Sequence, residues 1–299
     1  MIASRRSIKG RIFTFLLFLQ AALVVTGGAV RLTGSGLGCP TWPECTPGSY
    51  TPVPHQAEGQ LHAWIEFGNR LLTFLLLFTA VATLALTVRL SKNLLNKKRL
   101  RVLALLQVVG IFGQGILGGI TVLTDLNPIP VAGHYLLSIA LIAGASSLRF
   151  EIVGYEKQSV TPIVQLLIRL QLFLTIAVLI AGTVVTGSGP HAGDENSKRF
   201  GFNTQMVSII HADLVIALVV LVFITYLIAK QDSQSILPRL KLFILTILIQ
   251  GVIGYVQYFT GLPELIVGFH LLGSTLVWIA AWSLFKVLNI KLISGEATK

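Results

Sequence analysis

Charge is what this sequence has least of. Only 12% of its 299 residues are charged, about half of the ~25% found in soluble domains, whereas 54% are hydrophobic and the mean hydropathy is +0.79. A composition of this kind excludes disordered, collagen-like and coiled-coil proteins, and it nearly excludes a soluble multidomain protein. The chain has long apolar runs instead, which are typical of a protein that crosses a membrane several times.

Eight apolar runs are each close to the roughly 20 residues that a helix needs to span a bilayer. The first run is not expected to be a cleaved signal peptide, because it is long and no small-residue cleavage pattern precedes Gly34. The sequence therefore predicts an all-α polytopic membrane protein. We expect its transmembrane helices at 11–31, 61–89, 101–124, 130–149, 163–186, 205–229, 238–260 and 264–287.

The charges that are present are unevenly distributed between the predicted helices. The net charge is +11, but the basic residues gather between apolar runs, which favours a topological signal over binding of nucleic acid. Because basic residues stay on the cytoplasmic side, we expect both termini in the cytoplasm, a plasma-membrane location, and external loops at 32–60 and 187–204. Of the 23 Lys and Arg residues, all but four fall on the predicted cytoplasmic side, and the exceptions are Arg31, Arg70, Lys198 and Arg199.

Cysteine is almost absent, and both cysteines fall in the first predicted external loop. Cys39 and Cys45 lie six residues apart around Pro40 and Trp42, and outside the cytoplasm such a pair is expected to form a disulfide. Without histidine or acidic ligands at suitable spacing, the pair does not predict a zinc site. The disulfide could staple the loop, or it could report redox poise or pass electrons.

The sequence repeats itself at a spacing of 136 residues. Gln114-Gly115-Ile116-Leu117-Gly118 corresponds to Gln250-Gly251-Val252-Ile253-Gly254, and the same spacing carries His134 onto His270 without a gap. The glycines of these motifs are expected to allow close helix packing. The repeat predicts two four-helix bundles, related by an axis along the membrane normal. We call residues 1–150 the N-terminal half and residues 151–299 the C-terminal half.

Three histidines lie within predicted helices, where ionisable groups are costly and indicate function. His134, His211 and His270 precede the first cytoplasmic-side charge of their helices by 15, 19 and 16 residues, which places them in the outer part of the bilayer at about 1.5 Å per residue. His211 and His270 lie on alternate helices of one half, where two neutral imidazoles suit a single low-spin haem iron. The alternative is that each histidine only caps or hydrogen-bonds a nearby group.

The N-terminal half has His134 but no second histidine at matching depth. Asn69 stands there instead, 20 residues before Arg89. His62 lies two helical turns farther out on the same face, and Glu66 falls between His62 and Asn69. This asymmetry suggests that one half stores a cofactor while the other half carries out chemistry.

Two arginines, Arg31 and Arg70, lie at the outer ends of the first two predicted helices. Their guanidinium groups could bind carboxylates such as haem propionates. Alternatively, they could only anchor the helices at the membrane interface.

Three segments of the sequence carry a family likeness. They are Val30–Cys45, which contains Thr33-Gly34-Ser35-Gly36 and the cysteine pair, Ile65–Arg70, and Gly182–His191. Together with the two predicted halves and their outer histidines, these segments resemble the haem A synthase family over essentially the whole chain. The likeness is greatest to the high-GC Gram-positive branch of that family.

The resemblance implies oxidation of the C8 methyl group of haem O to the formyl group of haem A, for cytochrome oxidase assembly. In this family the methyl group is thought to be hydroxylated twice before water is lost. The resemblance also implies a haem b held by His211 and His270 and a substrate haem O bound through His134, with a catalytic role for Glu66. Haem O synthase and cytochrome oxidase assembly factors would be partners in the lipid membrane, and no nucleic acid is implied.

The chain departs from the family pattern at one position of the N-terminal half. The family commonly has a histidine three residues after the glutamate, where this chain has Asn69. Either His62 supplies the second ligand of the substrate iron, or that iron is five-coordinate or weakly held by Asn69.

Two other functions fit parts of the pattern. A bis-histidine cytochrome that only transfers electrons would need two comparable ligand pairs, which Asn69 contradicts unless His62 substitutes for it. A haem carrier with alternating access would need broken helices and polar groups near the midplane, whereas the ionisable groups of this chain lie outward.

Overall fold

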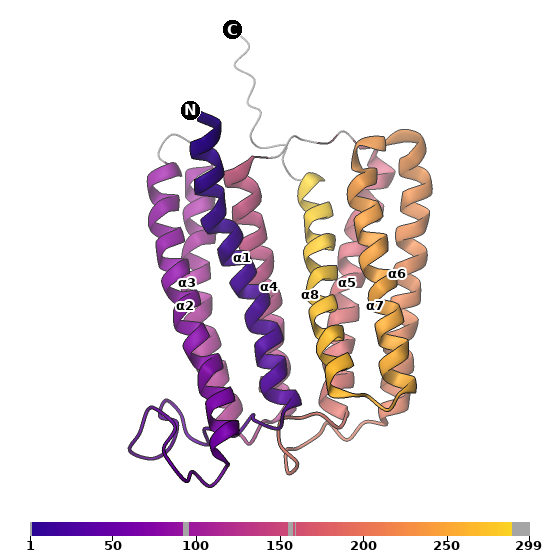
Figure 1. The fold of residues 1–299 in the computed structure, drawn as a ribbon. Helices are drawn as coiled ribbons and strands as arrows, with labels where there is room; N and C mark the ends of the chain where they lie inside the picture. The colour runs from indigo at the N-terminus through magenta and orange to yellow at the C-terminus, as the bar shows by residue number, and fades with distance from the viewer. Residues whose placement is uncertain (1, 92–95, 155–157, 159, 289–299) are drawn as a thin grey trace.

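The protein consists of long helices joined by short connections and two larger loops (Figure 1). The computed structural model describes residues 2–91, 96–154, 158 and 160–288. Within those ranges the long helices are α1 (Ile2–Leu32), α2 (Gln60–Leu90), α3 (Lys97–Leu123), α4 (Pro128–Val153), α5 (Pro162–Ser188), α6 (Thr204–Asp232), α7 (Leu237–Phe259) and α8 (Glu264–Leu288). A short 3₁₀ turn, η2 (Gln234–Ile236), precedes α7.

All eight of these helices are long and apolar enough to cross a membrane. Each predicted segment coincides with one helix and extends at most one residue beyond it, so the all-α polytopic membrane fold is confirmed. Side chains as large as Phe78 and Phe173 are 74% and 72% exposed, which suits a surface that faces lipid. Four basic residues used to predict the topology lie outside the described residues, namely Lys92, Lys157, Lys291 and Lys299.

The starts of two helices follow from the local sequence. Pro128 opens α4, where its missing N–H is not needed, and the Asn127 side chain accepts a 3.0 Å hydrogen bond from the Ile129 N–H. At the start of α6, the Asn203 side chain accepts a 2.9 Å hydrogen bond from the Met206 N–H. These caps fix the ends of two helices that carry histidines a short distance further on.

The helices form two groups, α1–α4 and α5–α8, which lie next to each other (Figure 1). Within each group every helix packs against the next, and the last packs against the first. As a result, α2 lies diagonally across from α4, and α6 lies diagonally across from α8. Helices α1, α4, α5 and α8 make the contacts between the two groups.

Polar contacts join α4 to α8 along the boundary between the groups. The Trp282 Nε1 donates a 2.9 Å hydrogen bond to Ser147 Oγ, and the buried Lys286 ammonium lies 3.0 Å from Glu151 Oε1. In both pairs the partners are 135 residues apart, close to the spacing of the predicted repeat. If the two groups were related by a symmetry axis between α4 and α8, residues at nearly corresponding positions of the repeat would meet in this way. The repeat itself stays a prediction.

Candidate functional site

Three partly buried histidines lie on even-numbered helices, and each faces a glycine of the preceding helix. Without a side chain on the glycine, the imidazole can lie directly against the backbone of the neighbouring helix. The closeness can be expressed as the distance from a methyl group, if one were added to the glycine, to the Cε1 atom of the ring. This distance is 3.6 Å for Gly118 and His134, 3.4 Å for Gly182 and His211, and 3.1 Å for Gly254 and His270.

The backbone at two of these histidines is held in the same way. The Gln114 Nε2 donates a 3.1 Å hydrogen bond to the His134 carbonyl, and the Gln250 Nε2 donates a 2.8 Å hydrogen bond to the His270 carbonyl. Gln114 and Gln250 are corresponding positions of the predicted repeat. Each bond ties the histidine to the helix before it and so limits where the ring can lie.

Each of the three imidazoles has a ring nitrogen that the protein does not satisfy. The Nδ1 atoms of His134, His211 and His270 are buried without a hydrogen-bond partner among the residues that the structure describes. Such an atom costs about 1–3 kcal/mol. Because the buried Nδ1 atoms are enclosed by protein, a metal would have to bind the opposite nitrogen, Nε2, of each ring. Because imidazole is a common axial ligand of haem iron, these side chains fit a haem group.

His211 and His270 come from the diagonal helices α6 and α8. They lie close enough to interact electrostatically, and each helix packs against α5 and α7. Diagonal helices of a four-helix group are where the two axial ligands of one iron would come from.

Asn69 occupies a fourth position of this kind. It lies on α2, and a methyl group added to Gly27 of α1 would lie 3.8 Å from its Nδ2 atom. The Thr26 hydroxyl donates a 2.8 Å hydrogen bond to Asn69 Oδ1. Asn69 therefore faces a glycine of the preceding helix, as the three histidines do, and its helix lies diagonally across from the helix of His134.

His62 is bonded to the first loop, which we define as residues 33–59. Its Nδ1 atom lies 3.1 Å from Ser35 Oγ, which lies 2.8 Å from Thr33 Oγ1. His62 is seven residues from Asn69 along α2, a distance of about 10 Å in an α-helix. The structure thus places His62 with the loop and Asn69 among the helices.

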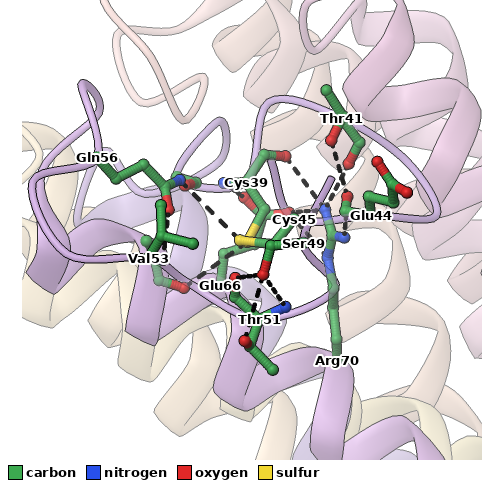
Figure 2. The surroundings of a disulfide bond; sticks show 12 residues. Cys39, Thr41, Glu44, Cys45, Ser49, Thr51, Val53, Gln56, Glu66 and Arg70 are labelled. Carbon is green, nitrogen blue, oxygen red and sulfur yellow. Dashed lines mark hydrogen bonds and ion pairs between the residues drawn. A yellow bond between two sulfur atoms is a disulfide. The ribbon is translucent and has the colours of Figure 1, made fainter. Parts of the chain in front are cut away.

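A disulfide joins Cys39 to Cys45 in the first loop and confirms the predicted pairing (Figure 2). The loop packs on Glu66 of α2, whose Oε2 accepts a 2.7 Å hydrogen bond from the Cys39 N–H. The Gln56 Nε2 donates a further hydrogen bond of 2.5 Å to the Gly38 carbonyl. Because Glu66 is only 7% exposed, the loop covers most of its carboxylate.

Arg70 joins Glu66 to the same loop (Figure 2). Its Nη2 and Nε atoms lie 2.6 and 3.2 Å from Glu66 Oε1. Nη2 also reaches the backbone carbonyls of Cys39 and Thr41, and Nη1 reaches those of Pro43 and Glu44. Arg70 therefore binds a carboxylate that belongs to the protein itself.

Arg31 lies at the end of α1 beside the second loop, which we define as residues 189–203. Its guanidinium makes no hydrogen bond or ion pair with any residue in the described part of the chain, and it lies near enough to Arg199 to interact electrostatically. The Arg199 guanidinium is itself held by the carbonyls of Gly189 and Pro190, at 2.8 Å each. Two neighbouring cations of this kind would attract an anion.

The arrangement of these residues can be compared with known protein families. The chain matches the family model COX15-CtaA, described as cytochrome oxidase assembly protein, over residues 10–193. The match covers more than half of the chain and includes Glu66, Asn69, His134 and the disulfide. The chain belongs to this family. The match ends at residue 193, so His211 and His270 of this cytochrome oxidase assembly family member lie outside it.

Several relatives named Heme A synthase are similar to parts of the chain. Those of Lysinibacillus sphaericus and Bacillus licheniformis are each 33% identical over 46% of this chain and 42% of their own length. That of Geobacillus thermodenitrificans is 29% identical over 35% of this chain and 30% of its own length. The chain thus covers less than half of each of these relatives. The particular likeness to the high-GC Gram-positive branch stays a prediction.

Some features of this cytochrome oxidase assembly family member were not predicted from its sequence. The i, i+4 spacing of Glu66 and Arg70 was a signal for their ion pair, but the two roles considered for Arg70 were binding a ligand carboxylate and anchoring the helix at the membrane interface. The glycines at 118 and 254 stood out in the repeat, yet only as helix-packing residues. No sequence signal indicated the hydrogen bond between Thr26 and Asn69.

Proposed function

We propose that this protein is a haem A synthase, which oxidises the C8 methyl group of haem O to the formyl group of haem A. The observation that carries the proposal is the set of three imidazoles within membrane helices, His134, His211 and His270, each with a buried and unpaired ring nitrogen. The name of the relatives supports the same conclusion.

The C-terminal half would hold a haem b as resident cofactor, through His211 and His270. The chain's contribution is to hold two imidazoles on diagonal helices of one group. Leu214 and Val215, about one turn after His211, pack against the apolar core of the α5–α8 group and would keep water away from the ligands. A haem iron with two imidazole ligands supplies one-electron transfer.

The N-terminal half would bind the substrate haem O, with His134 as ligand. Glu66, one turn before Asn69 on α2, is the proposed catalytic carboxylate. Arg70 and the Cys39 N–H hold its two oxygens in one orientation. In that position it would accept a proton released as the methyl group is oxidised to the aldehyde, a four-electron step whose oxygen atom and electron acceptor (dioxygen, or water with a separate oxidant) must come from outside the chain.

The carboxylates of haem O would need cationic partners at the same end of the helices. Arg31 is the proposed partner, because its guanidinium makes no bond to the described residues and lies near Arg199. Arg70 is proposed to act on Glu66 instead, since its donors are directed to that carboxylate and to the first loop.

We place the protein in the cell membrane, with both termini in the cytoplasm and the first and second loops outside, on the basis of its basic residues. The start of α1 and the end of α8 lie at the same end of the molecule, opposite the two loops (Figure 1). Haem O carries a farnesyl tail and can reach the site through the lipid. Haem O synthase and cytochrome oxidase assembly factors are the proposed partners.

Expression of the chain in cells that make haem O but no haem A tests this function. Haem A is expected among the extracted pigments after chromatography, and it should be lost in a His134→Ala variant that keeps the resident b-type spectrum. If the pigments contained only the haems already made by the cell, while the purified protein reduced a dye, the chain would be an electron-transfer cytochrome instead.

A further inference from the structure

Four side chains occupy similar positions, one on each even-numbered helix. Asn69, His134, His211 and His270 all face a glycine of the helix before them, and we call these the four ligand positions. They form two diagonal pairs, α2 with α4 and α6 with α8. Three of the four positions hold imidazole, and the one on α2 holds an amide.

An amide differs from imidazole in what it can offer to iron. Imidazole nitrogen is a good ligand for iron, whereas an amide has a weak carbonyl oxygen and an NH₂ group that can only donate hydrogen bonds. The oxygen of Asn69 already accepts the 2.8 Å hydrogen bond from the Thr26 hydroxyl. The bond to Thr26 takes one of the two lone pairs of that oxygen and orients the side chain, so that the NH₂ end is left to donate elsewhere.

His62 is poorly placed to replace the missing imidazole. It lies two turns of α2 beyond Asn69, about 10 Å along the helix axis, and its Nδ1 is bonded to Ser35 in the first loop. Moving its ring to the position of Asn69 would require the outer end of α2 to shift. That end is held by the contacts of Glu66 and Arg70 with the loop.

We propose that His134 is the only protein ligand of the haem iron in the N-terminal half, and that the side of the iron facing Asn69 stays open to a small diatomic molecule. The Asn69 NH₂ group, oriented by Thr26, donates a hydrogen bond to that molecule. This inference rests on the proposed function, because it takes the N-terminal half to be the haem O site. The C-terminal half, with imidazole at both positions, has no such open side.

The two halves then have different spectroscopic signatures in one protein. Purified protein from cells making haem O is expected to contain one low-spin haem, held by His211 and His270, and one high-spin haem. After reduction with dithionite, carbon monoxide should bind the high-spin haem and leave the low-spin one unchanged. Electron paramagnetic resonance of the oxidised protein and the optical spectrum with carbon monoxide measure both properties.

Variants of Asn69 on α2 test whether its side chain is a ligand of the iron. In Asn69→His the high-spin signal should be replaced by a second low-spin signal, and carbon monoxide binding should be lost. In Asn69→Ala the high-spin signal should remain, because no ligand has been removed. His62→Ala should leave both haem spectra as they are. The unchanged low-spin signal of the C-terminal half shows in each sample that the variant is folded.

Two results would overturn the inference. One is a wild-type protein in which both haems are low-spin and neither binds carbon monoxide. The other is a His62→Ala or Asn69→Ala variant that changes the ligation of the second haem. Either result could occur in a protein that still forms haem A, so the inference can fail while the proposed function stands. A protein that forms no haem A in the pigment experiment contradicts the function separately.

Discussion

Replacing His211 or His270 with alanine is expected to abolish the low-spin b-type haem signal of the purified protein. Each substitution removes one of the two proposed axial ligands, and the remaining imidazole comes from the opposite helix of the group. An alanine side chain has no atom that can bind iron, so the site should lose its low-spin haem rather than hold it less tightly. The reduced-minus-oxidised optical spectrum, normalised to protein, measures the effect.

His191→Ala is the matched control for this experiment. His191 is also partly buried, but it lies in the second loop, and its Nε2 is 2.7 Å from the Leu262 carbonyl. The control removes an imidazole and a hydrogen bond without touching a proposed ligand, and the low-spin signal should survive. An unchanged low-spin signal in His211→Ala or His270→Ala would show that the replaced histidine is not a ligand of this haem.

Replacing Glu66 with glutamine is expected to lower haem A formation by about 10²–10⁴-fold, the usual contribution of a general acid or base. The amide has the shape of the carboxylate and can still accept the Cys39 N–H hydrogen bond, but its NH₂ group then replaces the oxygen that accepts from Arg70, and it cannot take up a proton at neutral pH. The low-spin haem of the C-terminal half should be retained. Haem O and haem A are measured by chromatography of the extracted pigments.

Glu44→Gln is the control for the glutamate. Glu44 belongs to the same loop, and its carboxylate accepts a 2.9 Å hydrogen bond from the Gly48 N–H without contacting Glu66 or Arg70. Haem A formation should be normal in this control. If Glu66→Gln kept full activity, the carboxylate would serve only to hold the loop, and if it lost the low-spin haem as well, its role would be structural for the whole protein.

The positions of the helices could be predicted because the membrane imposes one rule on every spanning segment. A helix in lipid must be long and apolar, and runs such as 205–229 carry that signal without reference to their neighbours. The exact ends were not predicted: α4 begins at Pro128, after the Asn127 cap, two residues before the predicted segment. The Cys39–Cys45 disulfide was predictable because the two cysteines had no other partner.

Contacts between distant residues could not be read in this way. The loop carbonyls that bind Arg70 come from residues 26 to 31 positions earlier, and only the folded loop brings them to α2. The sequence pattern gave His134 and Asn69 similar depths, but it did not reveal that Gly118 and Gly27 would face them. Hydropathy indicates that a residue lies in the membrane and does not identify its neighbour.

An experimental structure of the purified protein with its haems bound tests the central claim most directly. We expect one porphyrin between α6 and α8, with its iron bound by both His211 and His270, and a second between α2 and α4, with its iron bound by His134. If the imidazoles of His211 and His270 were directed away from each other, with no macrocycle between them, the account would be wrong.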